Sequence, residues 1–245
     1  MKVIDAHWDE RNLGVKTFEI LLSRDDRLED FLAEEKRLIE REGAQHLVVK
    51  IPVNCPRFLY ELPRHNYVFL ETSFTLSLRK KNYVVPGFLA RYEGTLSVNA
   101  TNQPEDLDRI FREISRGIFD TDRVALDPRF GRDCAGRRYI NWIRDLVRQG
   151  EPVYEVQIDQ DPLGFFVLKG VDATHAQGIL TGLYEKYENT GLGVLLMKKL
   201  TDTVWSLGYE TYIAHVVSNN PKALRSNLIF GSVIDEIAYH YVKTM

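Results

Sequence analysis

The spacing of apolar residues along the chain predicts an alternation of strands and helices. In the first half, apolar runs predict strands over 17–22, 46–51 and 67–78. Between them, apolar residues three and four apart predict a helix that ends at Gly43, and Pro56 begins a second, shorter helix. These elements make an α/β unit. The pattern breaks between residues 79 and 95, and we expect a soft boundary there.

The second half shows the same alternation more clearly. A strand is predicted over 96–100, Pro104 begins a helix, and an apolar stripe over 139–147 predicts another helix. The remaining elements are predicted as strands over 153–158, 164–171 and 176–184, a helix over 192–207, a strand over 211–217, a helix from residue 220 and a strand over 234–242. The predicted order is strand, two helices, three strands, helix, strand, helix and strand.

These elements predict an α/β (α+β) fold with a mixed central sheet and two domains, a smaller α/β domain over 1–94 and a second domain over 95–245. The composition is ordinary for a globular protein, with 44% hydrophobic and 27% charged residues. The net charge of −3 does not favour nucleic acid or an anionic membrane as partner. No apolar run approaches the roughly 18 residues of a membrane span, and the first residues lack a signal core. We therefore expect a cytoplasmic protein.

Two cysteines, Cys55 and Cys134, lie far apart in the chain and match no metal-binding spacing. We expect both to be free thiols, wholly or partly buried, in a protein without a metal.

The most informative segment is Tyr187-Glu188-Asn189-Thr190-Gly191-Leu192-Gly193, which joins a predicted strand to a predicted helix. Gly191 and Gly193 let the backbone come close to a ligand. The amides of such a loop, together with the free N–H groups at the helix start, can bind a pyrophosphate. A glycine pair before a helix is common by chance, so the loop alone is a weak signal.

This order of elements, with a glycine loop between the fourth strand and the third helix, resembles the GNAT N-acetyltransferase superfamily from about residue 97 to 245. The family loop pattern Gln/Arg-x-x-Gly-x-Gly/Ala corresponds to residues 188–193, and its Asn-x-x-Ala helix start corresponds to 220–223. The resemblance implies acetyl-CoA as acyl donor. It further implies that the cofactor is bound by Thr181, Gly182, Leu183, Glu188, Asn189, Thr190, Gly191, Leu192, Gly193 and Asn220.

A narrower resemblance is carried by residues 119–130 together with 139–143. These segments are similar to the TDP-fucosamine acetyltransferase-like group, which acetylates an amine on a nucleotide-linked sugar (a TDP-4-amino-4,6-dideoxy sugar). That group has an extra N-terminal α/β domain, which residues 1–94 fit in size, and a partial GNAT-like unit is one alternative for this domain. Arg123 and Asp127 would then border the acceptor pocket. The alternative is that Arg123 and Asp127 pair with each other and pin a loop.

Two positions depart from the family pattern. Glu188 stands where the family has Gln or Arg, and a carboxylate adds no attraction for pyrophosphate. Asn227 stands where many members have a tyrosine that protonates the leaving thiolate, and an amide can only donate a hydrogen bond. The predicted strand over 176–183 offers no carboxylate as base, which leaves His175 and His215 as candidates. We take His215 and Asn227 as the candidate catalytic residues.

The sequence thus predicts an acetyl-CoA-dependent N-acetyltransferase that acts on a primary amine of a small molecule, with a nucleotide-linked amino sugar as the favoured acceptor. One alternative is acylation of an amino acid, peptide or antibiotic amine. Another, of a different class, is a non-catalytic module that binds acyl-CoA. We expect no nucleic-acid or membrane partner, and we leave a homodimer open.

Overall fold

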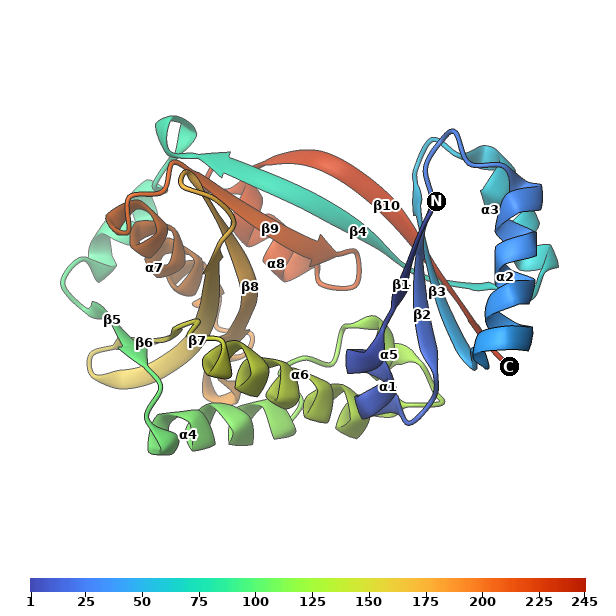
Figure 1. Ribbon diagram of the computed structural model, residues 1–245. Helices are drawn as coiled ribbons and strands as arrows, with labels where there is room; N and C mark the ends of the chain where they lie inside the picture. Colours follow the sequence, from blue (N-terminus) through green and yellow to red (C-terminus); the bar gives the residue numbers. More distant parts are fainter.

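A sheet of ten strands runs through the whole protein in the computed structural model, which describes residues 1–245 (Figure 1). The strands are β1 (Lys2–Asp5), β2 (Thr17–Leu21), β3 (His46–Pro52), β4 (Val68–Arg79), β5 (Leu96–Thr101), β6 (Val153–Ile158), β7 (Asp161–Gly170), β8 (His175–Leu183), β9 (Thr211–Val217) and β10 (Val233–Thr244). Their order across the sheet is β1-β2-β3-β10-β4-β9-β8-β7-β6-β5. The mixed α/β fold agrees with the sequence-based expectation.

Helices cover both faces of this sheet. They are α1 (His7–Leu13), α2 (Leu28–Glu42), α3 (Pro56–Arg64), α4 (Pro104–Ser115), α5 (Arg123–Leu126), α6 (Gly131–Arg148), α7 (Gly193–Ser206) and α8 (Pro221–Leu228), with short 3₁₀ turns at Lys80–Asn82, Gly87–Tyr92 and Glu185–Tyr187. None of the helices is both long enough and apolar enough to cross a membrane. The periodicity missed three short elements, β1, α1 and α5, because a few residues carry too little pattern to be recognised.

Two segments of the chain repeat the same arrangement of elements. In one, β1 pairs antiparallel with β2, α2 follows, and β3 pairs parallel with β2. In the other, β7 pairs antiparallel with β8, α7 follows, and β9 pairs parallel with β8. Each segment then continues through a short helix, α3 or α8, into one long last strand, β4 or β10. We call these segments the N-terminal unit (1–79) and the C-terminal unit (161–244).

The last strands of the two units are exchanged. β4 leaves the N-terminal unit and pairs with β9, from Ser73↔Val217 to Arg79↔Thr211. β10 leaves the C-terminal unit and pairs with β3, from Ala238↔Pro52 to Thr244↔His46. The two exchanged strands also pair with each other, antiparallel, at the centre of the sheet. The boundary expected near residue 94 stays a prediction, but the units on either side of it share their strands.

Alternation along each strand places apolar side chains on both faces of the sheet, where they pack against helices. Leu76 and Leu78 of β4 pack with Leu195, Leu200 and Val204 of α7 in the core of the C-terminal unit. In the N-terminal unit, Val49 and Ile51 of β3 pack with Phe31 and Phe58 of α2 and α3. On the opposite face, α4 and α6 cover β7 around Phe165 and Val167. In Figure 1, α6, α5 and α1 cross below the exchanged strands.

Candidate active site

Strands β8 and β9 separate halfway along their length. They pair in parallel only from His175↔Thr211 to Gly178↔Ala214. Beyond that point β8 continues to Leu183 beside β7, while β9 continues to Val217 beside β4 (Figure 1). The edge of β8 that faces the gap therefore has no strand partner over its last residues, Thr181, Gly182 and Leu183. Unpaired backbone groups at such an edge are available to an extended ligand.

The glycine loop follows this edge and leads into α7. Asn189 and Gly191 have left-handed backbones, with φ of 60° and 80°. The amides of Asn189, Gly191, Gly193 and Val194 donate no hydrogen bond within the protein. These free N–H groups surround the N-terminus of a helix, where the helix dipole also favours negative charge. The arrangement can bind a phosphate group.

Lys222 brings a positive charge to the same loop. Its Nζ donates to the side-chain oxygen of Asn189 at 2.7 Å, and its side chain is exposed. Glu188 is also exposed and forms no ion pair or side-chain hydrogen bond. Lys222 lies inside the Asn-x-x-Ala segment, but nothing in that pattern predicts that this lysine reaches the glycine loop. Asn220 caps α8, because its side-chain oxygen accepts from the amide of Ala223 at 3.0 Å.

Asn227 is buried on α8. Its Nδ2 donates to the carbonyl of Ala223 at 2.9 Å, and its Oδ1 is buried without a hydrogen-bond donor. An amide nitrogen has two hydrogens, so one remains for another acceptor. Tyr184, a possible substitute acid, instead donates its hydroxyl to Glu155 at 2.6 Å, and burial together with that carboxylate raises its pKa. Tyr239 packs in the core of the N-terminal unit.

Only one of the two candidate histidines lies at the gap. His175 begins β8 and hydrogen-bonds Asp172 at 2.9 Å in the β7–β8 turn, at the end away from the glycine loop. His215 comes directly after Ala214, the last β9 residue that pairs with β8. Its Nδ1 lies 3.2 Å from Oγ1 of Thr75 on β4. His215 is therefore the histidine located where the two strands part.

The environment of His215 favours the neutral imidazole. Surrounding protein and the positive charge of Lys50 lower its pKa, while Glu236 opposes this shift. The side chain nevertheless remains exposed to solvent, which is consistent with a position in the wall of a concave surface. A neutral, accessible imidazole can accept a proton near neutral pH.

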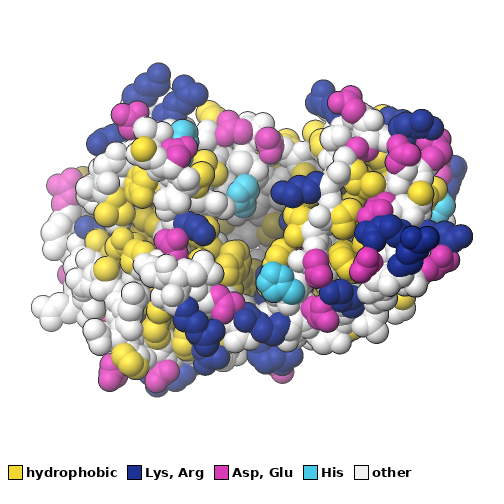
Figure 2. Space-filling view, in the orientation of Figure 1, with side chains coloured by type: hydrophobic (Ala, Val, Ile, Leu, Met, Phe, Trp, Pro, Cys, Tyr) yellow, Lys and Arg dark blue, Asp and Glu magenta, His cyan; other side chains and the backbone are white.

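Polar side chains, some buried and some exposed, lie along this face of the exchanged strands. Register places Glu71 opposite His240, Thr75 opposite Glu236, and His240 opposite Lys50. His240 Nδ1 lies 3.1 Å from Glu71 Oε1, and the other Glu71 oxygen is buried without a donor. Figure 2 shows the molecule hollowed at its centre, between the two units, with histidine side chains near the rim. We call this hollow the central cleft.

Arg123 does not pair with Asp127, so that alternative was wrong. Arg123 is buried and forms ion pairs with Asp9 and with Glu19, the latter at 3.4 Å, while Asp127 binds Arg129. Arg138 also binds Asp9, at 2.5 Å. Burial would raise the pKa of Asp9, but Arg123 and Arg138 outweigh it and hold this pKa at about 2. The cluster attaches α5 and α6 to the N-terminal unit. A role of Arg123 and Asp127 at the acceptor pocket stays a prediction.

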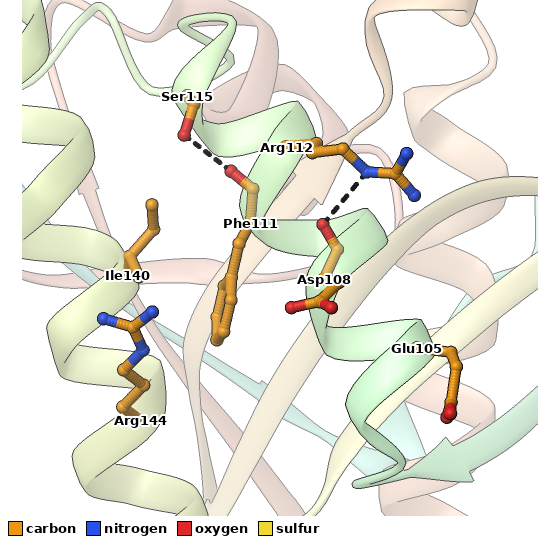
Figure 3. Close-up of a pocket in the computed structure, with 7 residues that line it drawn as sticks. All are labelled: Glu105, Asp108, Phe111, Arg112, Ser115, Ile140 and Arg144. Carbon is orange, nitrogen blue, oxygen red and sulfur yellow. Dashed lines mark hydrogen bonds between the residues drawn. The ribbon is translucent and has the colours of Figure 1, made fainter.

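Two open cavities lie on the side of the sheet covered by α4 and α6. One, of about 640 Å³, lies between these helices, and Figure 3 shows Phe111 and Arg144 facing each other across it. None of the residues that line it belongs to β8, β9 or the glycine loop. The other, of about 470 Å³, lies between the end of α6 and β7–β8 and is lined by Trp142, Lys169 and Ile179. Ile179 is the first β8 residue after the last pair with β9, so this second cavity borders the gap.

The cysteines behave as expected. Cys55 and Cys134 are both buried and both free. Cys134 donates to the carbonyl of Asn12 at 3.2 Å, and burial raises its pKa. Neither thiol is available as a nucleophile.

The family comparison agrees with this geometry. Residues 115–226 match the model of the Acetyltransferase (GNAT) family, a range that contains β8, the glycine loop and the Asn220 helix start. No curated protein matches the sequence. The match covers less than half of the chain, and the chain shares its fold with solved GCN5-related N-acetyltransferases.

Solved structures resemble the chain over nearly its full length at low identity. A GCN5-related N-acetyltransferase from Sphaerobacter thermophilus gives a TM-score of 0.65 at 9% identity, covering 99% of this chain and 75% of the other. One from Kribbella flavida gives 0.58 at 12%, covering 93% and 80%. A protein described as functionally unknown from Staphylococcus epidermidis gives 0.60 at 12%, covering 96% and 88%. At these identities the comparisons show a shared fold that includes the N-terminal unit.

Proposed function

We propose that the protein is an acetyl-CoA-dependent N-acyltransferase that acts on a primary amine of a small molecule. The observation that carries this proposal is the gap between β8 and β9, which leads from the free amides of the glycine loop to His215. A pyrophosphate bound at Asn189–Val194 would let the pantetheine arm lie along Thr181–Leu183. The thioester would then reach the central cleft beside His215.

The cofactor fits the residues that are present. Free amides and Lys222 supply donors and charge for phosphate groups, and the open edge of β8 offers backbone groups for the amides of pantetheine. When bound, acetyl-CoA supplies the activated acyl group. The residues of this chain orient the acetyl-CoA and accept protons from the amine, because an ammonium group must lose a proton before it can attack.

The acceptor would enter the central cleft. Glu236 is exposed on this face and gives it a negative charge that attracts an ammonium group, and Ser73 and Thr75 add hydroxyls that can hydrogen-bond a polar acceptor. We propose an amino sugar, carried on a nucleotide, as the first acceptor class to test. A fungal glucosamine N-acetyltransferase region has a similar fold, with a TM-score of 0.63 at 9% identity, which supports the choice of glucosamine derivatives as probes.

The test has two stages. A thermal-shift panel of coenzyme A thioesters would show which acyl donor stabilises the protein, because a ligand that binds only the native state raises the melting temperature. Release of free thiol with pooled amines, including amino sugars, amino acids, peptides and aminoglycosides, would then identify the acceptor. Absence of stabilisation by every thioester would contradict the proposal at its first step.

A non-catalytic acyl-CoA-binding module remains the second candidate. It is favoured by Asn227, which stands at the position of the family acid and has one of its donors bound to Ala223. Stabilisation by a thioester without thiol release on any amine would support this module and exclude the enzyme.

A further inference from the structure

We propose that the exchanged strands complete the catalytic site of the C-terminal unit. In this proposal Thr75 of β4 is a positioning residue that fixes His215, and Glu236 of β10 faces the same imidazole to hold the acceptor's charge. The inference rests on the acyl transfer proposed above and assigns part of that reaction to residues outside the C-terminal unit's own strands β7–β9.

The strand register places these three side chains in one row. Thr75 is the partner of His215 on one side and of Glu236 on the other. Directly opposed residues of antiparallel strands lie on the same face, with Cβ atoms about 5 Å apart. The contact of Thr75 Oγ1 with His215 Nδ1 at 3.2 Å confirms this arrangement. A bulge between Ile234 and Glu236 brings Glu236, rather than Asp235, opposite Thr75.

The contact to Thr75 determines what His215 can do. When Nδ1 carries its hydrogen and donates it to Thr75 Oγ1, Nε2 keeps a free lone pair. The ring is also held in one orientation at the point where β8 and β9 part. The lone pair of Nε2 can then accept a proton from a group in the central cleft.

Two protons leave the acceptor nitrogen during the reaction, and both pass through Nε2 of His215. The acceptor ammonium gives one proton to Nε2, which passes it to water. The amine lone pair then attacks the thioester carbonyl, and a C–N bond forms. As the C–S bond breaks, the second nitrogen proton moves through Nε2 to the leaving sulfur, so the products are the amide, coenzyme A thiol and one released proton. His215 thereby supplies the acid that Asn227 cannot.

Charged groups on two neighbouring strands, β3 and β10, act on this imidazole. Lys50 of β3 disfavours its protonation and Glu236 favours it. Glu71 and His240 lie further along the same face and bind each other. Tyr139 and Arg138 of α6 lie nearer to Asp122 and Asp9. Glu236 and Lys50 are therefore the pair whose removal should move the titration of His215 in opposite directions.

The test compares four variants with the wild type. Thr75→Val keeps the size of the side chain but removes the hydroxyl, and Thr75→Ser restores it. Glu236→Gln and Lys50→Gln each remove one charge. We would measure kcat/KM against pH on an accepted amine, the KM for acetyl-CoA, and the titration of His215 by NMR with ¹³C-labelled histidine, assigned with His215→Gln.

We expect Thr75→Val to lower kcat about tenfold, the effect of one lost hydrogen bond, with the KM for acetyl-CoA unchanged and Thr75→Ser close to the wild type. Glu236→Gln should move the acid limb of the profile and the NMR titration to lower pH, and Lys50→Gln should move both to higher pH. A Thr75→Val variant with wild-type kcat and pH profile would overturn the inference. A His215 titration that is the same in Glu236→Gln, Lys50→Gln and the wild type would also overturn it.

The two proposals fail in different ways. A wild-type protein that binds acetyl-CoA but releases no thiol with any amine contradicts the proposed function. The NMR titration needs no turnover, and in that case it still decides whether Thr75 and Glu236 control the imidazole.

Discussion

Lys222 of α8 donates to the side chain of Asn189 in the glycine loop at 2.7 Å. This contact joins the start of one helix to the loop before another, and it places an exposed ammonium group beside free backbone amides. The loop pattern therefore lacks the family's Gln or Arg at residue 188 but has a cation nearby. The positive charge comes from a different element of the fold.

Replacement of Lys222 should weaken coenzyme A binding. We expect Lys222→Met to raise the Kd for acetyl-CoA about fivefold to tenfold, because it removes a charge-assisted contact to phosphate. Calorimetry at low and moderate salt would measure it. Glu188→Gln is the matched comparison, since it removes a negative charge from the same loop and should bind equally or more tightly. Equal affinity of Lys222→Met and the wild type would show that the lysine contacts Asn189 but does not contribute to cofactor binding.

Bulk at the glycine loop should block the cofactor. Gly193 has open space around its Cβ position, with Leu183 at 4.0 Å, so Gly193→Val should fold. It should nevertheless lose binding of acetyl-CoA, because the side chain would cover the free amides. Gly191→Val should lose binding and also some stability, because its φ of +80° is unfavourable for a β-branched residue.

Gly208, at the end of α7, is the control for backbone strain. It has a φ of +92° and open space around it, but it lies at the other end of the helix from the loop. Gly208→Val should cost stability and leave cofactor affinity unchanged. Wild-type affinity for acetyl-CoA in a folded Gly193→Val protein would show that the glycine loop does not bind the cofactor.

Asn227 should contribute one hydrogen bond to turnover. Its second amide hydrogen is not used by Ala223, so it can stabilise the leaving thiolate. We expect Asn227→Ala to lower kcat about tenfold, and Asn227→Asp to lower it further because a carboxylate would repel the thiolate. Steady-state rates with one accepted amine would measure both. Full activity in Asn227→Ala would leave the residue a purely structural part of α8.

Lowering the pH should destabilise the folded protein, because the folded protein holds His46 in its neutral form. This histidine is buried beside Thr244, and burial together with Arg123 and Arg129 lowers its pKa from 6.5 to about 4. The unfolded chain binds a proton at His46 below pH 6.5, while the folded chain does not until about pH 4. Stability should therefore fall by about 3 kcal/mol across that window.

Urea unfolding at pH 7 and pH 5 would measure about 2 kcal/mol of this loss, because pH 5 lies within the window. A His46→Gln variant should show a smaller change between the two values. The stabilisation from the Asp9 ion pairs is fully present above its ordinary pKa of 3.8 and is lost only below it, so it does not change in this range. An equal pH dependence in both proteins would assign the effect to other groups.

The sequence was sufficient for most elements because each had its own local signal. The stripe on α7, the proline starts of α4 and α8, and the glycine stop of α2 all depend on residues close together in the chain. The position of the glycine loop before α7 follows from the same local order. Gly191 has the left-handed backbone that such a loop suggests.

The surroundings of the site could not be predicted in this way. Thr75 and His215 are far apart in sequence, and nothing near either residue indicates that β4 lies beside β9. The partners of Arg123 are likewise distant, in α1 and β2. Strand order depends on which long-range pairings bury the most surface, and a local pattern carries no information about that choice.

The exchange of β4 and β10 also affects how the chain reaches its native state. Neither unit can complete its part of the sheet until the other supplies a strand, and β10 pairs with β3, which lies far before it in the sequence. Such non-local contacts give a high contact order and slow folding. They also make unfolding cooperative across both units. Separate fragments of residues 1–94 and 95–245 would each present an unpaired strand edge, and mixing them should let each fragment fold on the other.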